Sequence, residues 1–277
     1  MTIMIDNTEL KRYVPNVLRE AAGEPAFIDK LTEFLEQTER WVAEMFTGDS
    51  LLADAADADT HGLRKLILPV MIDEAMSNAL PSLDLVLTPN GFGIVSNQNI
   101  APASKERVER LAKSLVKNRD TAICQLFAKL SRLKDWHSTE QCRWFADVFL
   151  SNPADTEYYA GEKGVWMSYL ELRPEMRKIE NWIADKFLGQ EYLQELREKQ
   201  IGIQTRSNQD IPVMAAVKQA VLESIKQGIM FAGGIVYAVN IIRDNPDAYP
   251  TWHGSLIAQV YGHETFKNKK RSNGYFF

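Results

Sequence analysis

Apolar residues recur along most of the chain at the three- and four-residue spacing of amphipathic helices. Between residues 25 and 46, one such face carries Phe27, Leu31, Leu35 and Val42, and Gly48 follows where a helix would end. The same criterion predicts helices over residues 7–13, 25–46, 63–80, 104–133, 139–150, 166–172, 175–187, 190–199 and 210–244. For the helix from 139, the S-x-x-Q spacing of a capping box at 138–141 marks the start. The sequence therefore predicts a mainly α fold, a helical bundle.

One segment departs from helical spacing. Leucine occupies alternate positions from 83 to 87, which is the period-two pattern of a half-buried strand. A turn at 89–91 follows, and residues 92–95 can return as the second strand. The pattern predicts a β-hairpin over 83–95, and the alternative is a glycine-containing loop between two helices. Residues 201–205 are a second, shorter strand candidate, so we expect one or two small hairpins.

Two short motifs occur twice and in the same order. The pattern E-x-W-[VI]-A-x-x-F-x-G covers residues 39–48 and again 180–189, and the polar element at 96–102 is echoed at 207–212. We interpret the chain as two duplicated halves. The first half carries extra residues between its motifs, and Trp41 and Trp182 would occupy equivalent core positions. Chance coincidence of short motifs is the alternative. The expected organisation is a first repeat at 1–137 with its hairpin at 83–95, a second repeat at 138–248 and an extended C-terminal tail at 249–277.

Composition and charge narrow the class of protein. The chain has 277 residues, of which 45% are hydrophobic and 25% charged, as in an ordinary globular protein with one large or two small domains. The net charge of -5 argues against a general nucleic-acid binder, which needs a basic face for phosphates. Cys124 and Cys142 lie among apolar residues at helical spacing. We therefore expect buried free thiols in a reducing compartment, with a disulfide as the alternative.

No stretch has the pattern of a membrane or export segment. The N-terminus lacks the basic start and apolar core of a signal peptide. The longest apolar run, residues 229–242, contains Asn240 and is shorter than the roughly 18 residues that a membrane helix needs. We expect a buried helix there and no membrane partner.

The residues alone point to no catalytic or metal chemistry. Carboxylates alternate before a glycine at 57–62, but Leu68 stands where a calcium loop needs its glutamate. The four histidines are scattered, without a second ligand at helical spacing. The glycine-rich stretches lack the lysine of a phosphate loop, and G-x-S-x-G is absent. We therefore expect no catalytic residue, cofactor or metal ligand, and an enzyme with an unrecognised site is the alternative.

Three short segments are suited to contact other proteins. The first is the hairpin tip, and the second is the polar turn after it, whose side chains can instead serve the turn itself. The third is the C-terminus, where a basic cluster precedes three aromatic residues that are a liability in water unless they dock. We expect this tail to cross to an adjacent protein, with a disordered tip as the alternative. The candidate residues are Pro89, Asn90, Gly91, Phe92, Asn97, Gln98, Lys269, Lys270, Arg271, Tyr275, Phe276 and Phe277.

The stretch LDLVLTPNGFGIVSNQNIAPASKERVERL at 83–111, with the Gly-Tyr-Phe-Phe ending, resembles a family of uncharacterised proteins encoded by phages and prophages of gut bacteria. The resemblance extends over most of the chain, and its most specific part is LTPNGFG-x-VSN. It implies a virion structural protein encoded near capsid and portal genes. The implied role is that of a head–tail connector, or adaptor, or of a head-completion protein that assembles on the portal. Such adaptors are small helical proteins that form a ring, whereas this chain is longer and looks duplicated.

The resemblance also implies partners and a location. The partners would be other copies of the chain in a ring, the portal and tail proteins, and DNA if the basic tail reaches the portal channel. The protein would reside in the virion, and in the host cytoplasm during assembly. A soluble bacterial helical binding module remains the non-viral alternative.

Overall fold

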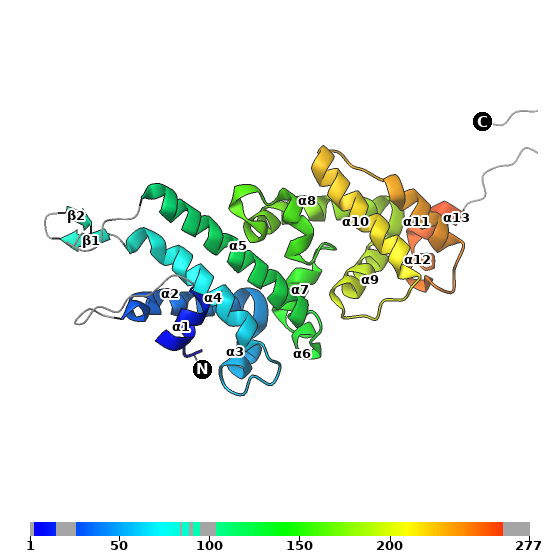
Figure 1. Ribbon diagram of the computed structural model, residues 1–277. Helices are drawn as coiled ribbons and strands as arrows, with labels where there is room; N and C mark the ends of the chain where they lie inside the picture. The colour runs from blue at the N-terminus through cyan, green and yellow to red at the C-terminus, as the bar shows by residue number, and fades with distance from the viewer. Residues whose placement is uncertain (1–2, 15–25, 84, 89–90, 95–103, 263–277) are drawn as a thin grey trace, which may run out of the picture. The chain divides into compact units, whose positions relative to one another are not determined.

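The computed structural model describes residues 3–14, 26–83, 85–88, 91–94 and 104–262 (Figure 1). Helices dominate these residues, which confirms the mainly α prediction. The α-helices and strands are α1 (Asn7–Tyr13), α2 (Phe27–Val42), α3 (Gly48–Ala56), α4 (Arg64–Ala79), β1 (Leu85–Thr88), β2 (Gly91–Ile94), α5 (Lys105–Leu130), α6 (Lys134–His137), α7 (Glu140–Ala146), α8 (Val165–Ile183), α9 (Gln190–Ile201), α10 (Asp210–Gln227), α11 (Gly233–Arg243), α12 (Pro250–His253) and α13 (Leu256–Gly262). Five shorter helical turns are η1 (Ala43–Thr47), η2 (Leu80–Ser82), η3 (Pro153–Tyr159), η4 (Gly161–Lys163) and η5 (Ala184–Leu188).

The chain divides into two compact units. The first unit is Met1–Arg173 with Ile201–Ile203, and the second is Pro174–Gln200 with Gln204–Phe277. The first unit thus extends past residue 137, where the sequence interpretation ended the first half, because Phe145 and Trp166 pack against Phe46. Residues 249–262 are not an extended tail, since they form α12 and α13 around a buried Trp252.

The core of the first unit surrounds α4. This helix is apolar on nearly every side, and it packs against α2 and α5. The face of α2 that carries Leu31, Leu35 and Val42 is buried as its spacing predicts. Pro69 lies inside α4 without ending it, and the residues on both sides of the proline, Leu68 and Val70, are buried. Tertiary packing therefore maintains the helix where a backbone donor is missing.

A two-stranded hairpin lies between α4 and α5 in the chain. β1 and β2 pair antiparallel, with Leu87 opposite Phe92 and Thr88 opposite Gly91. Within the described residues these strands form a sheet of two, so each has one edge without a strand partner.

A π-helical turn changes the direction of the chain after α2. The turn η1 follows Val42, and Gly48 ends it with φ 73° and ψ 164°, a conformation that is essentially restricted to glycine. The wider π turn leaves carbonyl oxygens exposed to other donors. The indole Nε1 of the fully buried Trp136 donates to Phe46 O at 2.6 Å. The amide Nε2 of Gln141 donates to Ala43 O and Glu44 O at 3.2 and 3.1 Å.

The second unit contains the same arrangement. After α8, the π turn η5 ends at Gly189 with φ 78° and ψ 150°. The indole Nε1 of the buried Trp252 donates to Phe187 O at 3.0 Å. Tyr261 lies on the same side and donates its hydroxyl to Lys186 O at 3.1 Å.

Three sequence predictions for the second half are wrong. The helices expected at 166–172 and 175–187 are one helix, α8, which accommodates Pro174. The strand expected at 201–205 is absent, because Ile201 is the buried last residue of α9 and a turn follows it. The single helix expected over 210–244 is two. Gly228 ends α10 in the left-handed conformation, and α11 begins at Gly233.

The glycine at each π turn gives a stability prediction. A Cβ at Gly48 would lie 3.1 Å from Gln141 Oε1, and one at Gly189 would lie 3.3 Å from Ser255 Cβ. Both glycines also have a φ that other residues rarely adopt. We expect Gly48→Ala and Gly189→Ala each to lower the free energy of unfolding by about 2–4 kcal/mol, measured by urea denaturation.

Gly228→Ala is the control, because its Cβ would meet nothing within 4 Å while its φ of +66° is also left-handed. Its cost should be nearer 1 kcal/mol. Equal losses at all three glycines would contradict the role given to the π turns.

Candidate functional site

Most of the sequence-predicted interaction residues lie outside the part of the chain that the structure describes. These are Pro89, Asn90, Asn97, Gln98, Lys269, Lys270, Arg271, Tyr275, Phe276 and Phe277. Gly91 and Phe92 begin β2. A described cavity has a different lining, which the sequence did not single out.

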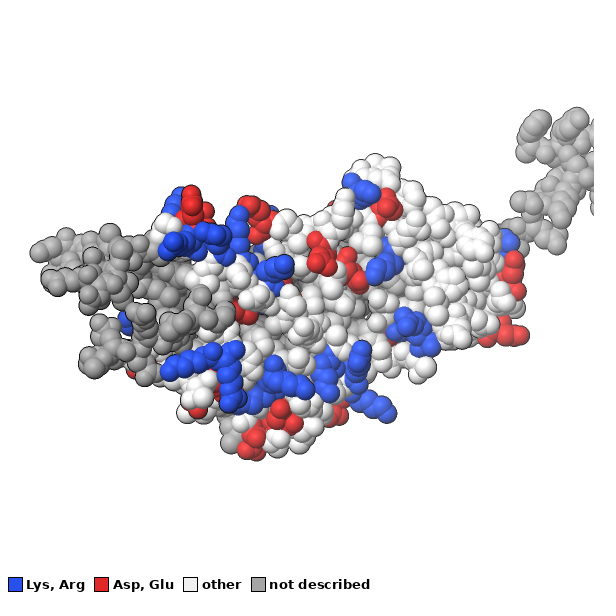
Figure 2. Space-filling model, viewed as in Figure 1, with Lys and Arg blue, Asp and Glu red and all other residues white. Residues whose placement is uncertain are grey.

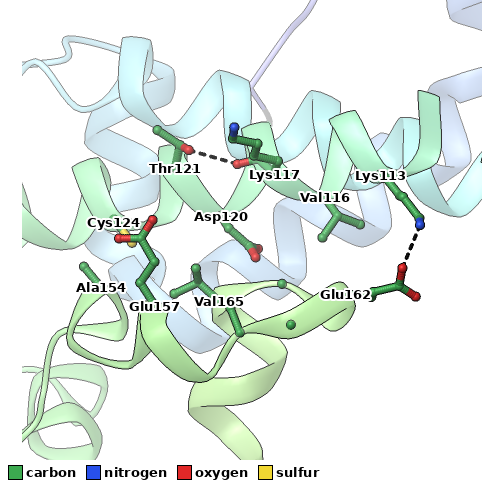
Figure 3. Close-up of a pocket in the computed structure, with 13 residues that line it drawn as sticks. Lys113, Val116, Lys117, Asp120, Thr121, Cys124, Ala154, Glu157, Glu162 and Val165 are labelled. Carbon is green, nitrogen blue, oxygen red and sulfur yellow. Dashed lines mark hydrogen bonds and ion pairs between the residues drawn. The ribbon is translucent and has the colours of Figure 1, made fainter. Parts of the chain in front are cut away.

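That cavity lies in the first unit and has a volume of about 640 Å³. One side is α5, from Lys113 to Cys124, and the other is the stretch between Ala154 and Val165. Figure 3 shows Asp120 on the cavity wall between these two sides, with Cys124 and Glu157 toward one end and Lys113 and Glu162 at the other. The cavity is therefore formed by packing one long helix against the loop region that leads into α8.

Asp120 fixes the two sides of the cavity together. Asp120 is 3% exposed, and its carboxylate accepts from both Nε and Nη2 of Arg119, at 2.9 and 2.8 Å. The second oxygen accepts from the backbone N–H of Trp166 at 3.3 Å. Gly164 makes this approach feasible, because any Cβ there would overlap Asp120 Oδ2. Asp120 is thus occupied by structural bonds on both oxygens.

The remaining polar groups of the cavity include a thiol and an ion pair. Burial raises the pKa of the Cys124 thiol to about 11, so it is protonated and weakly nucleophilic at neutral pH. Lys113 pairs with Glu162 at 2.9 Å across one end (Figure 3). Figure 2 shows basic and acidic side chains interspersed over the first half of α5. The cavity is large enough for a small polar molecule, and its lining also includes Lys117 and Glu157.

A buried ionic network lies where α4 meets α5. Arg119 Nη1 donates to Glu74 at 2.7 Å, while Nη2 and Nε donate to Asp120. Asp73, 8% exposed, is the third carboxylate near this one guanidinium. Burial raises the pKa of Asp73 to about 7, and the charge of Arg119 lowers it only partly. The network therefore contains a carboxyl group that is poorly stabilised when ionised.

A second hollow, of about 540 Å³, lies beside the π turn of the second unit. It is bounded by residues 184–191 and 254–257, and Asp185, Glu191 and Leu256 are exposed. In the first unit, the Gln141 side chain occupies the corresponding place and donates to the π-turn carbonyls. The second unit has an isoleucine, Ile257, which cannot donate.

The residues that sequence reasoning missed are those that close the π turns. Trp136 and Trp252 each stand before a histidine, and this Trp-His pair occurs twice in the sequence. A further repeated signal was available at 68–71, LPVM, and at 211–214, IPVM. Both tetrapeptides lie near the beginning of a helix that packs on the next, α4 or α10.

Comparisons with known proteins add little. The profile of a family of unknown function, DUF6712, matches residues 16–146, somewhat less than half of the chain and all within the first unit. No curated protein matches. No solved structure matches either. Among the described residues, no helix has the length and apolar character to cross a membrane, and no group of His, Cys, Asp and Glu is arranged to hold a metal ion.

The raised pKa of Asp73 predicts how stability depends on pH. The folded state binds a proton on Asp73 that the unfolded state loses above about pH 4, so this group makes the protein less stable as pH rises from 4 to 7. Asp73→Asn removes that charge. We expect the variant to be more stable than the wild type by about 1–4 kcal/mol at pH 8, with little difference at pH 4.

Urea denaturation at both pH values measures this difference. Glu106→Gln, at an exposed position of α5, is the control and should show no such pH-dependent gain. A destabilised Asp73→Asn at pH 8 would mean that the ionised carboxylate is needed by Arg119.

Proposed function

We propose that the chain is a virion structural protein, a head–tail connector or head-completion protein that assembles on the portal. The observation that carries the proposal is the hairpin segment. LTPNGFG-x-VSN, the most specific part of the resemblance to phage and prophage proteins, contains the end of β1 and the whole of β2. An isolated two-stranded ribbon is at best marginally stable in water, so its unpaired edges favour a partner strand or surface.

Exposed apolar side chains in the second unit support self-association. Ile229, Val236 and Tyr237 lie at the start of α11 or just before it, and they are 61%, 52% and 69% exposed. In the view of Figure 2, the face over α10 to α12 carries few charged side chains. Such patches are typical of protein–protein interfaces. We propose that this patch contacts another copy in a ring, with the portal and tail proteins as the other partners and DNA as a further one in the channel.

We also propose that α2–α7 and α8–α13 are two copies of one module. In both, a Trp–Phe edge contact precedes the glycine of the π turn, with centroids 5.2 Å apart for Trp41–Phe46 and 5.4 Å for Trp182–Phe187. The tryptophan that closes each turn also meets a second ring at 6.0 or 6.2 Å, Phe145 or Tyr261. The agreement of both pairs of ring contacts between the modules favours common ancestry over chance similarity.

The backbone after each closing tryptophan supports the same equivalence. Thr139 Oγ1 donates to Trp136 O and accepts from Cys142 N. Ser255 Oγ donates to Trp252 O and accepts from Ala258 N. When α2–α7 and α8–α13 are matched in chain order, α10 is the counterpart of α4. The polar elements at 96–102 and 207–212 are then out of register, because the first precedes α5 and the second leads into α10.

A binding module is the rival function, and the cavity beside Asp120 is the observation that favours it. The two roles make different demands. An adaptor needs the hairpin but not the cavity, whereas a protein that binds a small molecule needs the cavity but not the hairpin. The location of the gene tests the proposal at least cost, since a connector should be encoded beside portal or capsid genes.

Replacing residues 85–94 by a Gly-Ser linker of equal length tests the assembly role. We expect the replaced chain to fold, with a melting temperature close to that of the wild type, because the ribbon lies outside the α2–α4–α5 core. Its incorporation into particles should fall at least tenfold, measured by mass spectrometry of purified virions.

Tyr158→Ser is the control, since Tyr158 is 78% exposed in the first unit and away from the hairpin sequence. Its incorporation should be normal. Normal incorporation of the linker variant would contradict a connector role for the hairpin.

A further inference from the structure

The aromatic face beside the π turn of the first unit is covered by residues that follow α7. Trp166 lies 4.9 Å from Phe46 and 6.3 Å from Trp41, measured between ring centroids. Tyr169, one turn later in α8, stacks on Phe145 at 6.2 Å. Trp166 is 3% exposed and Tyr169 is fully buried. The segment after the last helix of the module thus covers Phe46 and Phe145, which are fully buried.

The counterpart face in the second unit lacks such a cover among the described residues. Phe187 is partly exposed, whereas its counterpart Phe46 is fully buried; Trp182 and its counterpart Trp41 are both partly exposed. Val260 occupies the position of Trp144 and is 69% exposed, and Leu256 at the start of the same helix is 78% exposed. In the first unit, the guanidinium of Arg173 covers Trp144 at 3.6 Å. The second unit therefore presents an apolar surface where the first has a packed one.

We propose that the chain's own C-terminal aromatic residues, Tyr275, Phe276 and Phe277, cover this face. The inference rests on the proposed equivalence of the two modules. Trp166 follows the end of α7 by about 20 residues, and Tyr275 follows the end of α13 by about 13. An extended chain gains about 3.3–3.6 Å per residue, so the intervening residues can span more than 40 Å. The aromatic triplet is long enough and suitably composed to take the place of Trp166 and Tyr169.

Charge complementarity supports the same occupant. The basic cluster Lys269, Lys270 and Arg271 precedes the aromatic triplet by a few residues. Asp185 and Glu191, both exposed, bound the hollow beside the π turn of the second unit. A tail that runs from α13 to this face brings opposite charges together at its edge. The second unit therefore carries acidic side chains that can pair with the basic cluster of the tail.

The chain's own tail is favoured over a second copy. A short tether gives an effective concentration in the millimolar range, far above that of a separate molecule in dilute solution. A second copy could instead place its first module on this face, in the way that α8 packs on the first unit. The residue of that module equivalent to Trp166 would then be Pro25. Proline at that position does not supply an aromatic ring.

Hydrogen exchange of the full-length chain tests the proposal, with two variants. The first changes Tyr275, Phe276 and Phe277 to Ser, and the second, Val260→Ser, changes the receiving surface at an exposed residue that should not affect folding. We expect both to raise amide exchange at 184–189 and 256–262 at least fivefold, with exchange in α2 and α5 unchanged. Ile211→Ser is the control at another exposed position of the second unit, 51% exposed, and should leave these peptides unchanged.

Unchanged exchange at 184–189 and 256–262 in the triple-Ser variant would overturn the proposal. Protection that disappears when the wild-type chain is diluted from 20 to 0.2 μM would overturn it too, because the cover would then come from a second copy. Different backbone paths in the two modules would refute the duplication, whereas these exchange measurements report on tail docking alone.

Discussion

Both units depend on one hydrogen bond from a buried indole to a carbonyl oxygen at the end of a π turn. Phe46 O receives its donor from Trp136, which is 90 residues further along the chain, and Phe187 O from Trp252, which is 65 residues further. A buried carbonyl left without a donor costs about 1–3 kcal/mol. The indole removes that cost, and its bulk fills the space beside the turn. The bond therefore fixes α6 and α7 on the end of α2, and α12 and α13 on the end of α8.

The indole–carbonyl bond has different surroundings in the two units. In the first, Gln141 adds two bonds to the π turn, and α8 covers the neighbouring rings. In the second, Ile257 adds none and the described residues leave the rings partly exposed. The first unit also carries the hairpin and the larger cavity. The two units therefore share the closed π turn and differ in the surfaces around it.

The sequence predicted the helical class because burial on one side of a helix leaves a periodic trace, as in Leu31, Leu35 and Val42. It also identified the Trp41 and Trp182 helices, whose motif ends at the glycine of the turn. The donors for those turns could not be predicted locally. The spacing at 138–141 predicts a capping box, but Thr139 caps α7 and Gln141 donates to Ala43 O and Glu44 O instead. A side chain's partner is a tertiary property, and spacing does not encode it.

The indole N–H groups test this account most directly, since the chain has six tryptophans and each gives its own ¹H–¹⁵N signal in a suitably labelled sample. Assigned by single Trp→Phe variants, the Nε1–H of Trp136 and Trp252 should exchange with solvent at least a hundredfold more slowly than that of the partly exposed Trp182. If Trp136 and Trp252 instead exchange as fast as Trp182, the indole–carbonyl bonds do not close the π turns, and the common frame of the two units is wrong.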